Sequence, residues 1–175
     1  LRVGVPPSFG SKWLVPRLYR FLNRHPHIRV EIVSEVDRSY RDCDISIDFR
    51  RTQFADFRIE PFIATEVFPV CSPAIAKNMA QPADLSKQTL LHEVSAMNDP
   101  DYPSWQSWFS TLGVNDKDVR KGPLFTLALM ALQAAIDGQG VALGQALLVE
   151  YDIAAGRLVR PFNVETPLRL DYYLI

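Results

Sequence analysis

The stretch PLFTLALMALQAAIDGQGVALG, residues 123–144, decides the fold. It predicts a helix over 127–137 that follows one short strand and leads into another at 141–143. Gly138 and Gly140 lie between the end of this helix and the start of the next strand, a position typical of a helix C-cap and a tight turn. Strand, helix and strand in close succession indicate an α/β domain.

The helix predicted at 127–137 is apolar on nearly all sides. A surface helix usually has a single apolar stripe, so an all-round apolar helix must be covered on more than one side. In a chain of 175 residues this pattern indicates burial against a second subunit.

The first third of the chain predicts strand, helix, strand, connection and strand. The strands are expected at 1–5, 28–33 and 45–49, and an amphipathic helix is expected at 11–24. Pro16 removes one backbone donor from that helix and is expected to bend it. This order is typical of a parallel sheet.

Further elements follow at shorter intervals. Strands are expected at 57–62, 67–71, 158–159 and 168–175, a helix end and a strand at 85–92, and helices at 73–79, 105–112 and 147–155. Ser72 is expected to cap the helix that begins at Pro73. Gly113 and Gly156 are expected to close the later helices.

Composition excludes several classes of function. The net charge is −1 and the pI is about 6.3, so no overall field attracts nucleic acid or an anionic membrane. The first thirty residues are basic and contain no acid, which we interpret as a solvated basic helix face. The longest apolar run, 123–136, is shorter than the roughly 20 residues of a membrane span.

No catalytic or metal-binding pattern stands out. There is no GxSxG motif, and His25, His27 and His92 are the only histidine bases available to a nucleophile. Cys43 and Cys71 lack the close spacing of a zinc site. The glycines after the 127–137 helix do not form a dinucleotide fingerprint, because that motif needs a strand before it and a helix after it. We therefore expect no enzyme activity, no catalytic residue, no metal and no cofactor.

Five strings, read together, resemble a known family. They are PSFGSKWLVPRLYRFLNRHP at 7–26, VFPVCSPAIA at 67–76, PADLSKQTLLHE at 82–93, LALMALQAAIDGQGVALG at 127–144 and AAGRLVRPF at 154–162. Their order and spacing resemble the ligand-sensing domain of LysR-type transcriptional regulators. The resemblance is strongest to the branch that includes the glycine-cleavage and β-lactamase regulators.

The resemblance implies an α/β fold of two Rossmann-like lobes with a hinge, similar to type 2 periplasmic binding proteins. Lobe I would comprise 1–63 and 167–175, and lobe II would comprise 64–166. The hinge would lie near 63–66 and 160–166, and it would close around a ligand.

The resemblance also implies partners. A small-molecule effector would bind between the lobes, and the signal would pass to an N-terminal winged helix-turn-helix. We expect that domain to be absent from this chain, so this chain alone should not bind operator DNA. Helices 12–24 and 127–137 would pair in a homodimer or homotetramer. We expect a cytoplasmic protein with no membrane partner.

The resemblance assigns ligand contacts to strand ends and helix starts. These residues are Ser8, Phe9, Asp48, Phe49, Glu66, Phe68, His92 and Thr126. Ser8 and the helix N-termini would hold the anionic group of a polar metabolite, such as a carboxylate or an amino-acid-like compound. Asp48 and Glu66 would instead favour a cationic or hydroxylated ligand. The connection 34–44 is shorter than is usual in the family, so a helix is lost there or residues are missing.

Three alternatives stay open at this point. A solute-binding protein of a transport system has a fold of the same class. An enzyme on a similar scaffold would need turnover that depends on His92. A domain that acts only through subunit contacts would have its cleft filled by side chains.

Overall fold

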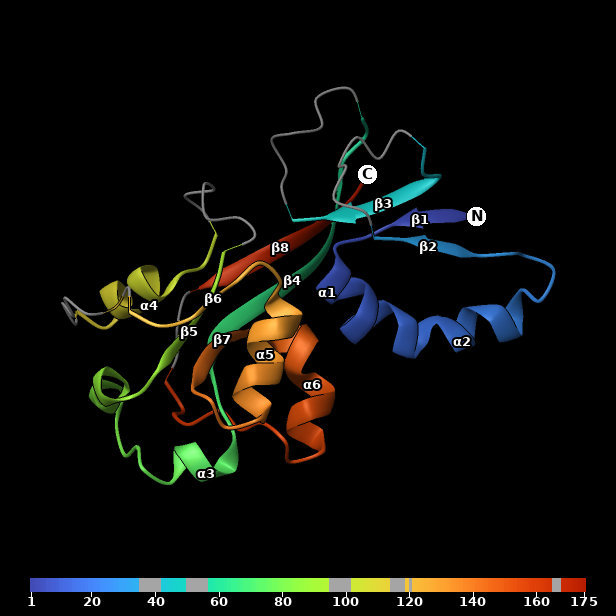
Figure 1. Cartoon of the computed structure of the whole chain (residues 1–175). Coiled ribbons are helices and arrows are strands. Elements are labelled where there is room, and N and C mark those ends of the chain that lie inside the picture. Colours follow the sequence, from blue (N-terminus) through green and yellow to red (C-terminus); the bar gives the residue numbers. More distant parts are fainter. Residues whose placement is uncertain (35–41, 50–56, 95–101, 114–118, 120, 165–167) are drawn as a thin grey trace. The chain divides into compact units, whose positions relative to one another are not determined.

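A computed structural model describes residues 1–34, 42–49, 57–94, 102–113, 119, 121–164 and 168–175 (Figure 1). The chain divides into two compact units, Leu1–Thr65 with Asp171–Ile175 and Glu66–Leu170. Strands β4 (Glu60–Val70) and β8 (Arg169–Leu174) each begin in one unit and end in the other. The chain therefore passes between the units twice.

The first unit is built on a small mixed sheet. Its strands are, in order, β2 (Glu31–Val33), β1 (Arg2–Gly4), β3 (Ile45–Asp48) and the end of β8. Val3 lies opposite Ile32 in one parallel pair and opposite Ile45 in the other. Ile47 lies opposite Leu174 in an antiparallel pair. The parallel pairs expected from the sequence are confirmed, and β8 makes the sheet mixed.

The helix predicted at 11–24 begins earlier than expected. α1 (Pro7–Phe9) leads into a π-helical turn at Gly10–Leu14, and α2 (Val15–Arg24) follows directly. Pro16 has no N–H with which to continue the i to i−4 ladder, and the widened turn lies directly before it. The irregularity expected at Pro16 therefore takes the form of this wide turn, and the helix continues past it.

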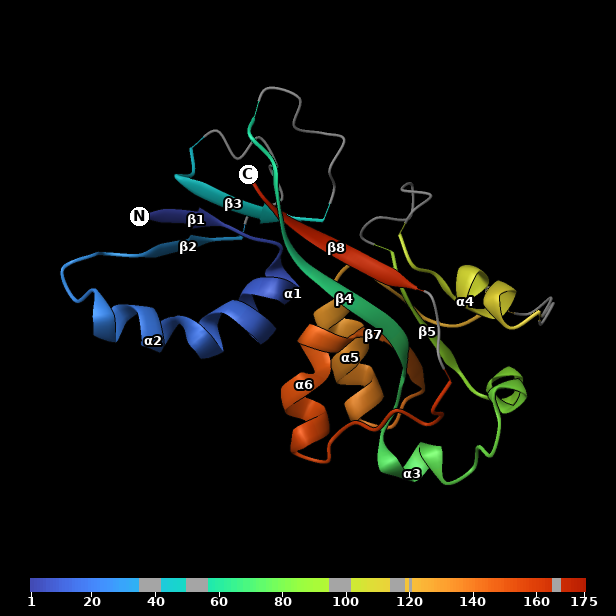
Figure 2. The same cartoon turned by 180° about the vertical axis from the view of Figure 1, so that it is seen from behind.

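The second unit contains the other part of the strand order. Its strands are, in order, β4, β7 (Val141–Gln145), β5 (Leu90–Glu93) and β6 (Leu124–Phe125). β4 runs antiparallel to β7, and β5 runs parallel to both of its neighbours. Figure 2 shows β7 between β4 and β5. Leu91 lies opposite Ala142, and His92 lies opposite Leu124.

Helices complete the second unit. They are α3 (Pro73–Ala76), a 3₁₀ helix at Pro82–Lys87, α4 (Trp105–Thr111), α5 (Ala128–Ile136) and α6 (Ala146–Ala154). Ser104 caps α4, because its hydroxyl accepts a hydrogen bond from the Ser107 N–H at 3.1 Å. Gly138 follows α5 with a φ of 75°, which confirms the C-cap that the sequence predicted.

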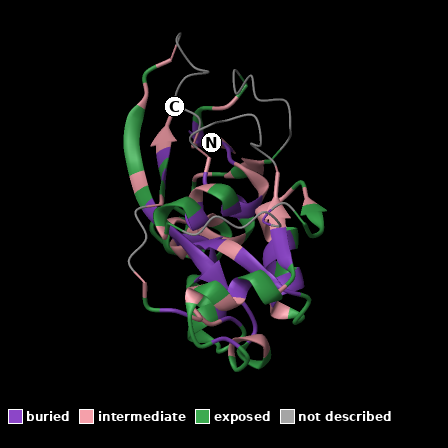
Figure 3. Cartoon of the chain, turned by 90° about the vertical axis from the view of Figure 1, so that its left-hand side faces the viewer, coloured by how far each residue is buried: buried purple, intermediate pink, exposed green. Residues whose placement is uncertain are grey.

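The main core of the second unit is aromatic. Trp105, Trp108 and Phe109 on α4 are at most 2 % exposed and pack edge to face or tilted against one another. They join strand and helix residues in one cluster with Leu85, Leu90 and others. In Figure 3 the strands of this unit are coloured largely as buried. The core therefore holds β5 and β7 against α4.

Two expectations about local structure were wrong. The strands predicted at 57–62 and 67–71 are one strand, β4, because the residues between them offer no glycine, asparagine or aspartate for a turn. The strand predicted at 158–159 is a single bridge between Val159 and Cys71. Ser72 is the N-cap residue of α3 and Pro73 begins the helix, as predicted, although the Ser72 hydroxyl makes no capping hydrogen bond. The connection 34–44 lies mostly outside the described residues.

Two helices differ sharply in burial. α2 has no buried residue, whereas α5 buries Ala131, Leu132, Ala134 and Ala135. The all-round apolar helix is therefore covered mainly within its own unit, although Met130 stays 48 % exposed. Among the described residues, none of the helices combines the length and apolar character that crossing a membrane requires.

Candidate functional site

The second unit contains a cavity of about 560 Å³. Its lining residues come from β4, β5, β6, β7, α4, α5 and the segment before α4, and they are Val67, Leu91, His92, Glu93, Val94, Tyr102, Pro103, Ser104, Trp105, Gln106, Val119, Leu124, Ala128, Ala131, Leu143 and Gln145. Small-molecule sites are typically roughly 300–1,000 Å³ and mostly apolar with a few placed polar groups. The size and lining of the cavity match that description.

Strand pairing fixes the floor of this cavity. β5 places His92 and Glu93 opposite Leu124 and Phe125 of β6. The Val94 N–H donates to the Phe125 carbonyl at 2.8 Å and extends the pairing by one residue. Because the chain turns into α5 just after β6, Ala128 and Ala131 reach the same cavity. Their small side chains leave space between the helix and the strands.

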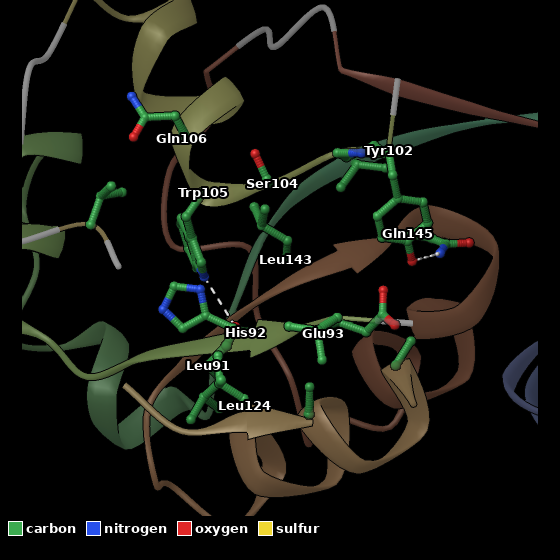
Figure 4. A pocket seen from close by; sticks show the side chains of 16 residues that line it. Leu91, His92, Glu93, Tyr102, Ser104, Trp105, Gln106, Leu124, Leu143 and Gln145 are labelled. Carbon is green, nitrogen blue, oxygen red and sulfur yellow. Dashed lines mark hydrogen bonds between the residues drawn. The ribbon is translucent and has the colours of Figure 1, made fainter. Parts of the chain in front are cut away.

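The polar groups of the lining occupy defined positions (Figure 4). The Gln145 amide donates to the Tyr102 hydroxyl at 3.5 Å, and the Glu93 carboxylate lies on the same side of the view. The Trp105 indole N–H donates to the Leu91 carbonyl at 3.0 Å, so this donor is used within the protein. Trp105 therefore offers its ring to the cavity.

His92 is held by the segment that leads into β6. Its Nε2 lies 3.2 Å from the Lys121 carbonyl oxygen, and a carbonyl only accepts, so Nε2 carries the hydrogen. Gly122 next to it has a φ of 135°, and an added Cβ would lie 1.9 Å from the Leu90 carbonyl oxygen. Only glycine fits this close approach to β5.

The other ligand contacts predicted in this unit lie elsewhere. Glu66 and Phe68 do not line the cavity, but both contact Arg160. The Arg160 guanidinium lies 4.4 Å from the centre of the Phe68 ring and 3.8 Å from the Glu66 carboxylate. It also donates to the Val164 carbonyl at 2.6 Å, so it ties β4 to the segment that leads toward β8.

Thr126 lies between β6 and α5 and is exposed. The N-cap residue of α5 is Leu127, which makes no side-chain capping hydrogen bond. Thr126 is therefore one residue too early to be the N-cap of this helix.

Two of the four contacts predicted in the first unit, Phe9 and Phe49, pack against one tyrosine. Phe9 packs at 4.7 Å and Phe49 at 6.1 Å from the ring centre of Tyr172 on β8. Phe9 is completely buried, and Ser8 beside it is 8 % exposed. Asp48 is also completely buried, and it accepts a hydrogen bond from the Phe49 N–H at 2.6 Å. The structure thus brings Phe9 and Phe49 together through Tyr172.

A second, smaller cavity of about 310 Å³ lies in the first unit. It is lined by the 59–64 part of the chain and by 171–173, including Tyr172. None of the eight predicted contacts lines it.

Several lining residues escaped the sequence reasoning. Glu93, Tyr102 and Gln145 were not chosen, and Tyr172 was missed in the first unit. Leu143 and Gln145 are two residues apart on β7, so their side chains lie on the same face of the strand. This alternation could have identified Gln145 as a lining residue. Tyr102 offered no comparable signal, since it precedes α4 in an irregular segment.

The remaining reactive groups do not form a site. Burial raises the pKa of the Cys71 thiol to about 11, which keeps it protonated and unreactive near neutral pH. Among the described residues, no group of three or more histidine, cysteine, aspartate or glutamate side chains is placed to hold a metal ion.

Comparisons with known proteins agree on one family. The family model described as the LysR substrate binding domain matches residues 1–175. The glycine cleavage system transcriptional activator of Escherichia coli (strain K12) is 39 % identical over 181 residues, which cover 100 % of this chain and 57 % of that protein. The transcriptional activator AmpR of Rhodobacter capsulatus is 32 % identical over 177 residues, covering 99 % of this chain and 58 % of that protein.

A solved structure supports the same relationship. The effector domain of the transcriptional regulator AmpR of Pseudomonas aeruginosa superposes with a TM-score of 0.83 at 28 % identity, covering 99 % of this chain and 84 % of that one. The mixed α/β fold is therefore that of a LysR effector-binding domain. This chain belongs to the LysR substrate-binding domain family. It spans a little over half the length of the curated relatives, 57 % of the Escherichia coli activator.

Proposed function

We propose that this chain is the effector-sensing domain of a LysR-type transcriptional regulator. One observation carries the proposal: the family model matches residues 1–175, and the relatives in question are named transcriptional activators. DNA binding is proposed for a further domain of a longer, cytoplasmic protein. The transport alternative finds no support among these relatives, and neither does an enzyme.

The proposed effector site includes the cavity of the second unit. Its volume of about 560 Å³ suits a metabolite, and His92 is the predicted contact that lines it. Ser8, Phe9, Asp48, Phe49, Glu66, Phe68 and Thr126 stay predicted contacts. The assignment of lobe I to 1–63 with 167–175 and of lobe II to 64–166 also stays a prediction.

Filling the cavity tests this site. Ala128 lines it at the first position of α5, so Ala128→Phe would occupy part of the space. Titration calorimetry with a panel of amino acids, amines, carboxylates and sugars should find a ligand whose affinity falls at least about tenfold in this variant. Ala83→Phe is the matched control, because Ala83 is exposed at the start of the 3₁₀ helix and does not line the cavity.

Two results would contradict the placement of the effector site in this cavity or the proposed function itself. Ligand binding that is identical in Ala128→Phe and in the parent places the effector outside this cavity. The absence of any binding across the panel in the parent chain argues against effector sensing itself.

We further propose that a second copy of this chain packs α2 against α5. On α2, Val15 is 53 %, Tyr19 55 % and Leu22 38 % exposed, although these are apolar or aromatic side chains. On α5, Met130 is 48 % exposed. Both helices thus present apolar area that a subunit contact would cover.

Charge supports the same pairing. Residues 1–30 contain arginines and a lysine but no acid, whereas α5 contains no lysine or arginine and is followed directly by Asp137. Complementary charge of this kind favours the approach of one helix to the other in a second copy.

The oligomeric state tests the pairing. Tyr19→Glu introduces a charge into the proposed contact, so sedimentation should show a weaker dimer. Tyr151→Glu is the control, since Tyr151 is 44 % exposed on α6, outside the two helices. Equal association of both variants with the parent would contradict the proposed interface.

A further inference from the structure

The apolar side chains in the cavity of the second unit narrow the class of effector; this inference rests on the proposed function. Leu124, Leu143 and Val94 line the cavity. Leu124 is 63 % exposed, and the other two are half-buried, so all three keep surface in contact with water. Removing such surface from water is favourable, and an apolar group of a ligand would do so.

The backbone holds Leu124 at the cavity. Leu124 lies opposite His92 in the parallel pair of β5 and β6, and the His92 N–H donates to the Pro123 carbonyl at 3.0 Å. At Gly122 an added Cβ would lie 1.9 Å from the Leu90 carbonyl oxygen, so this segment approaches β5 closely. A contact with a residue that is already in position costs little ordering on binding.

The indole ring of Trp105 is a second fixed apolar group. Its N–H donates to the Leu91 carbonyl at 3.0 Å, and its ring centre lies 5.9 Å from that of Trp108 and 6.0 Å from that of Phe109. In Figure 4 Trp105 and Leu124 lie on the same side of the view. This side of the cavity therefore presents apolar surface on a rigid support.

Polar groups lie on the other side of the same view (Figure 4). The Gln145 amide donates to the Tyr102 hydroxyl at 3.5 Å, and the Glu93 carboxylate lies on their side of the view. Amides and hydroxyls both donate and accept hydrogen bonds, so this side suits polar head groups of several kinds. The apolar side is more selective, because a fully polar group placed there would lose hydrogen bonds to water.

We propose that the effector is amphipathic and carries an alkyl or aromatic portion next to its polar head group. The apolar portion packs against Leu124 and the Trp105 ring. The head group lies toward Tyr102 and Gln145. The small side chains of Ala128 and Ala131 leave room for such a molecule.

Pairs of ligands with the same size and head group test the proposal in the parent chain. Titration calorimetry compares norvaline with homoserine, butylamine with propanolamine, and pentanoate with γ-hydroxybutyrate. Each pair exchanges a terminal methyl for a hydroxyl. In the head-group class that binds, the methyl member should bind at least about tenfold more tightly, since it avoids desolvating the hydroxyl.

Lengthening the apolar portion gives a second measurement in the parent. Each added methylene should raise the affinity about fourfold until the cavity is filled. The heat capacity change on binding should become more negative along the same series, because burial of apolar surface has that signature.

Leu124→Asn keeps roughly the size of the side chain and makes it polar. This variant should lose at least about fivefold in affinity for the methyl members while its thermal midpoint stays near that of the parent, since Leu124 is already exposed. Ile45→Asn is the matched control, because Ile45 is a 38 % exposed strand residue on β3 that does not line the cavity. It should bind as the parent does.

The outcomes separate this inference from the proposed function. If a sugar or a hydroxyl-bearing member binds as tightly as the methyl members, the effector is not amphipathic, and effector sensing stands. Equal affinity of Leu124→Asn and the parent for a methyl member would also contradict the inference. The ligand pairs decide the question in the parent even if Leu124→Asn does not fold. If no ligand of any class binds, the proposed function fails as well.

Discussion

The two units place their predicted contact residues in different surroundings. In the first unit Phe9 and Phe49 pack against Tyr172, and Phe9 has no exposed surface. In the second unit His92 lines a cavity together with Glu93. A residue at a helix start or at a strand end can thus be packed in a core or line a cavity. The side chains that surround it determine which of the two occurs.

The largest expected effect comes from Gly122→Ala, which disturbs the wall of the cavity. The new Cβ would lie 1.9 Å from the Leu90 carbonyl oxygen, at a φ of 135°. Urea denaturation should show a loss of more than about 4 kcal/mol in the free energy of unfolding.

Gly113→Ala is the control for that substitution. Gly113 also has a positive φ, 66°, but an added Cβ there would meet nothing within 4 Å. Its cost should be only about 1–2 kcal/mol, from the left-handed backbone alone. Equal losses in the two variants would show that the close approach to β5 is not the cause.

Phe9→Ala tests whether the aromatic cluster of the first unit is packing or a ligand contact. Removal of a completely buried ring should cost about 3–5 kcal/mol of the free energy of unfolding. Phe62→Ala, at a ring that is 38 % exposed, should cost clearly less. A stable Phe9→Ala variant that no longer binds effector would instead make Phe9 a ligand contact.

Trp105→Phe probes the hydrogen bond at the back of the cavity. The variant loses the 3.0 Å bond from the indole to the Leu91 carbonyl, whereas Trp108→Phe loses no such bond because Trp108 Nε1 has no hydrogen-bond partner among the described residues. Trp105→Phe should therefore be the less stable of the two by about 1 kcal/mol in thermal or urea unfolding. Similar stabilities would assign the role of Trp105 to packing alone.

The smallest expected effect is a pH dependence at Asp84, outside the cavity. Hydrogen bonds from the Ala80 N–H, from Lys87 and from the Gln81 N–H lower the pKa of Asp84 from 3.8. A carboxyl group whose pKa is lower in the folded state stabilises the fold at pH values above its pKa in the unfolded state. That contribution is lost as the pH falls through the pKa of the folded state. Asp84→Asn should thus unfold slightly earlier than the parent at neutral pH, and the difference should vanish in acid.

Sequence alone predicted much of the fold. The strand, helix and strand around Gly138 appear where expected. There the spacing of the apolar residues indicates the helix, and the glycine at its C-terminus indicates the same end. The single strand β4 was not predicted, because the alternation of apolar and polar residues does not show that an extended chain continues through a polar stretch. Its residues Val67–Val70 pair with β7, and β8 is its other neighbour in the sheet; both strands are distant in sequence.

The cavity was less predictable than the fold. His92 was chosen because it ends a strand, and β5 does bring it to the lining. Tyr102 and Gln145 meet there although they are 43 residues apart in the chain. No local pattern links such a pair, because it arises only when α4 and β7 pack on the same core.

Amide hydrogen exchange with a bound effector tests the central claim most directly, because it reports on the two units separately. A ligand in the cavity should slow exchange at β5, at β6 and in the first turn of α5, and Ala128→Phe should abolish that protection. Protection confined to α1 and the Tyr172 region, with β5 and α5 unchanged, would contradict the placement of the effector in the second unit.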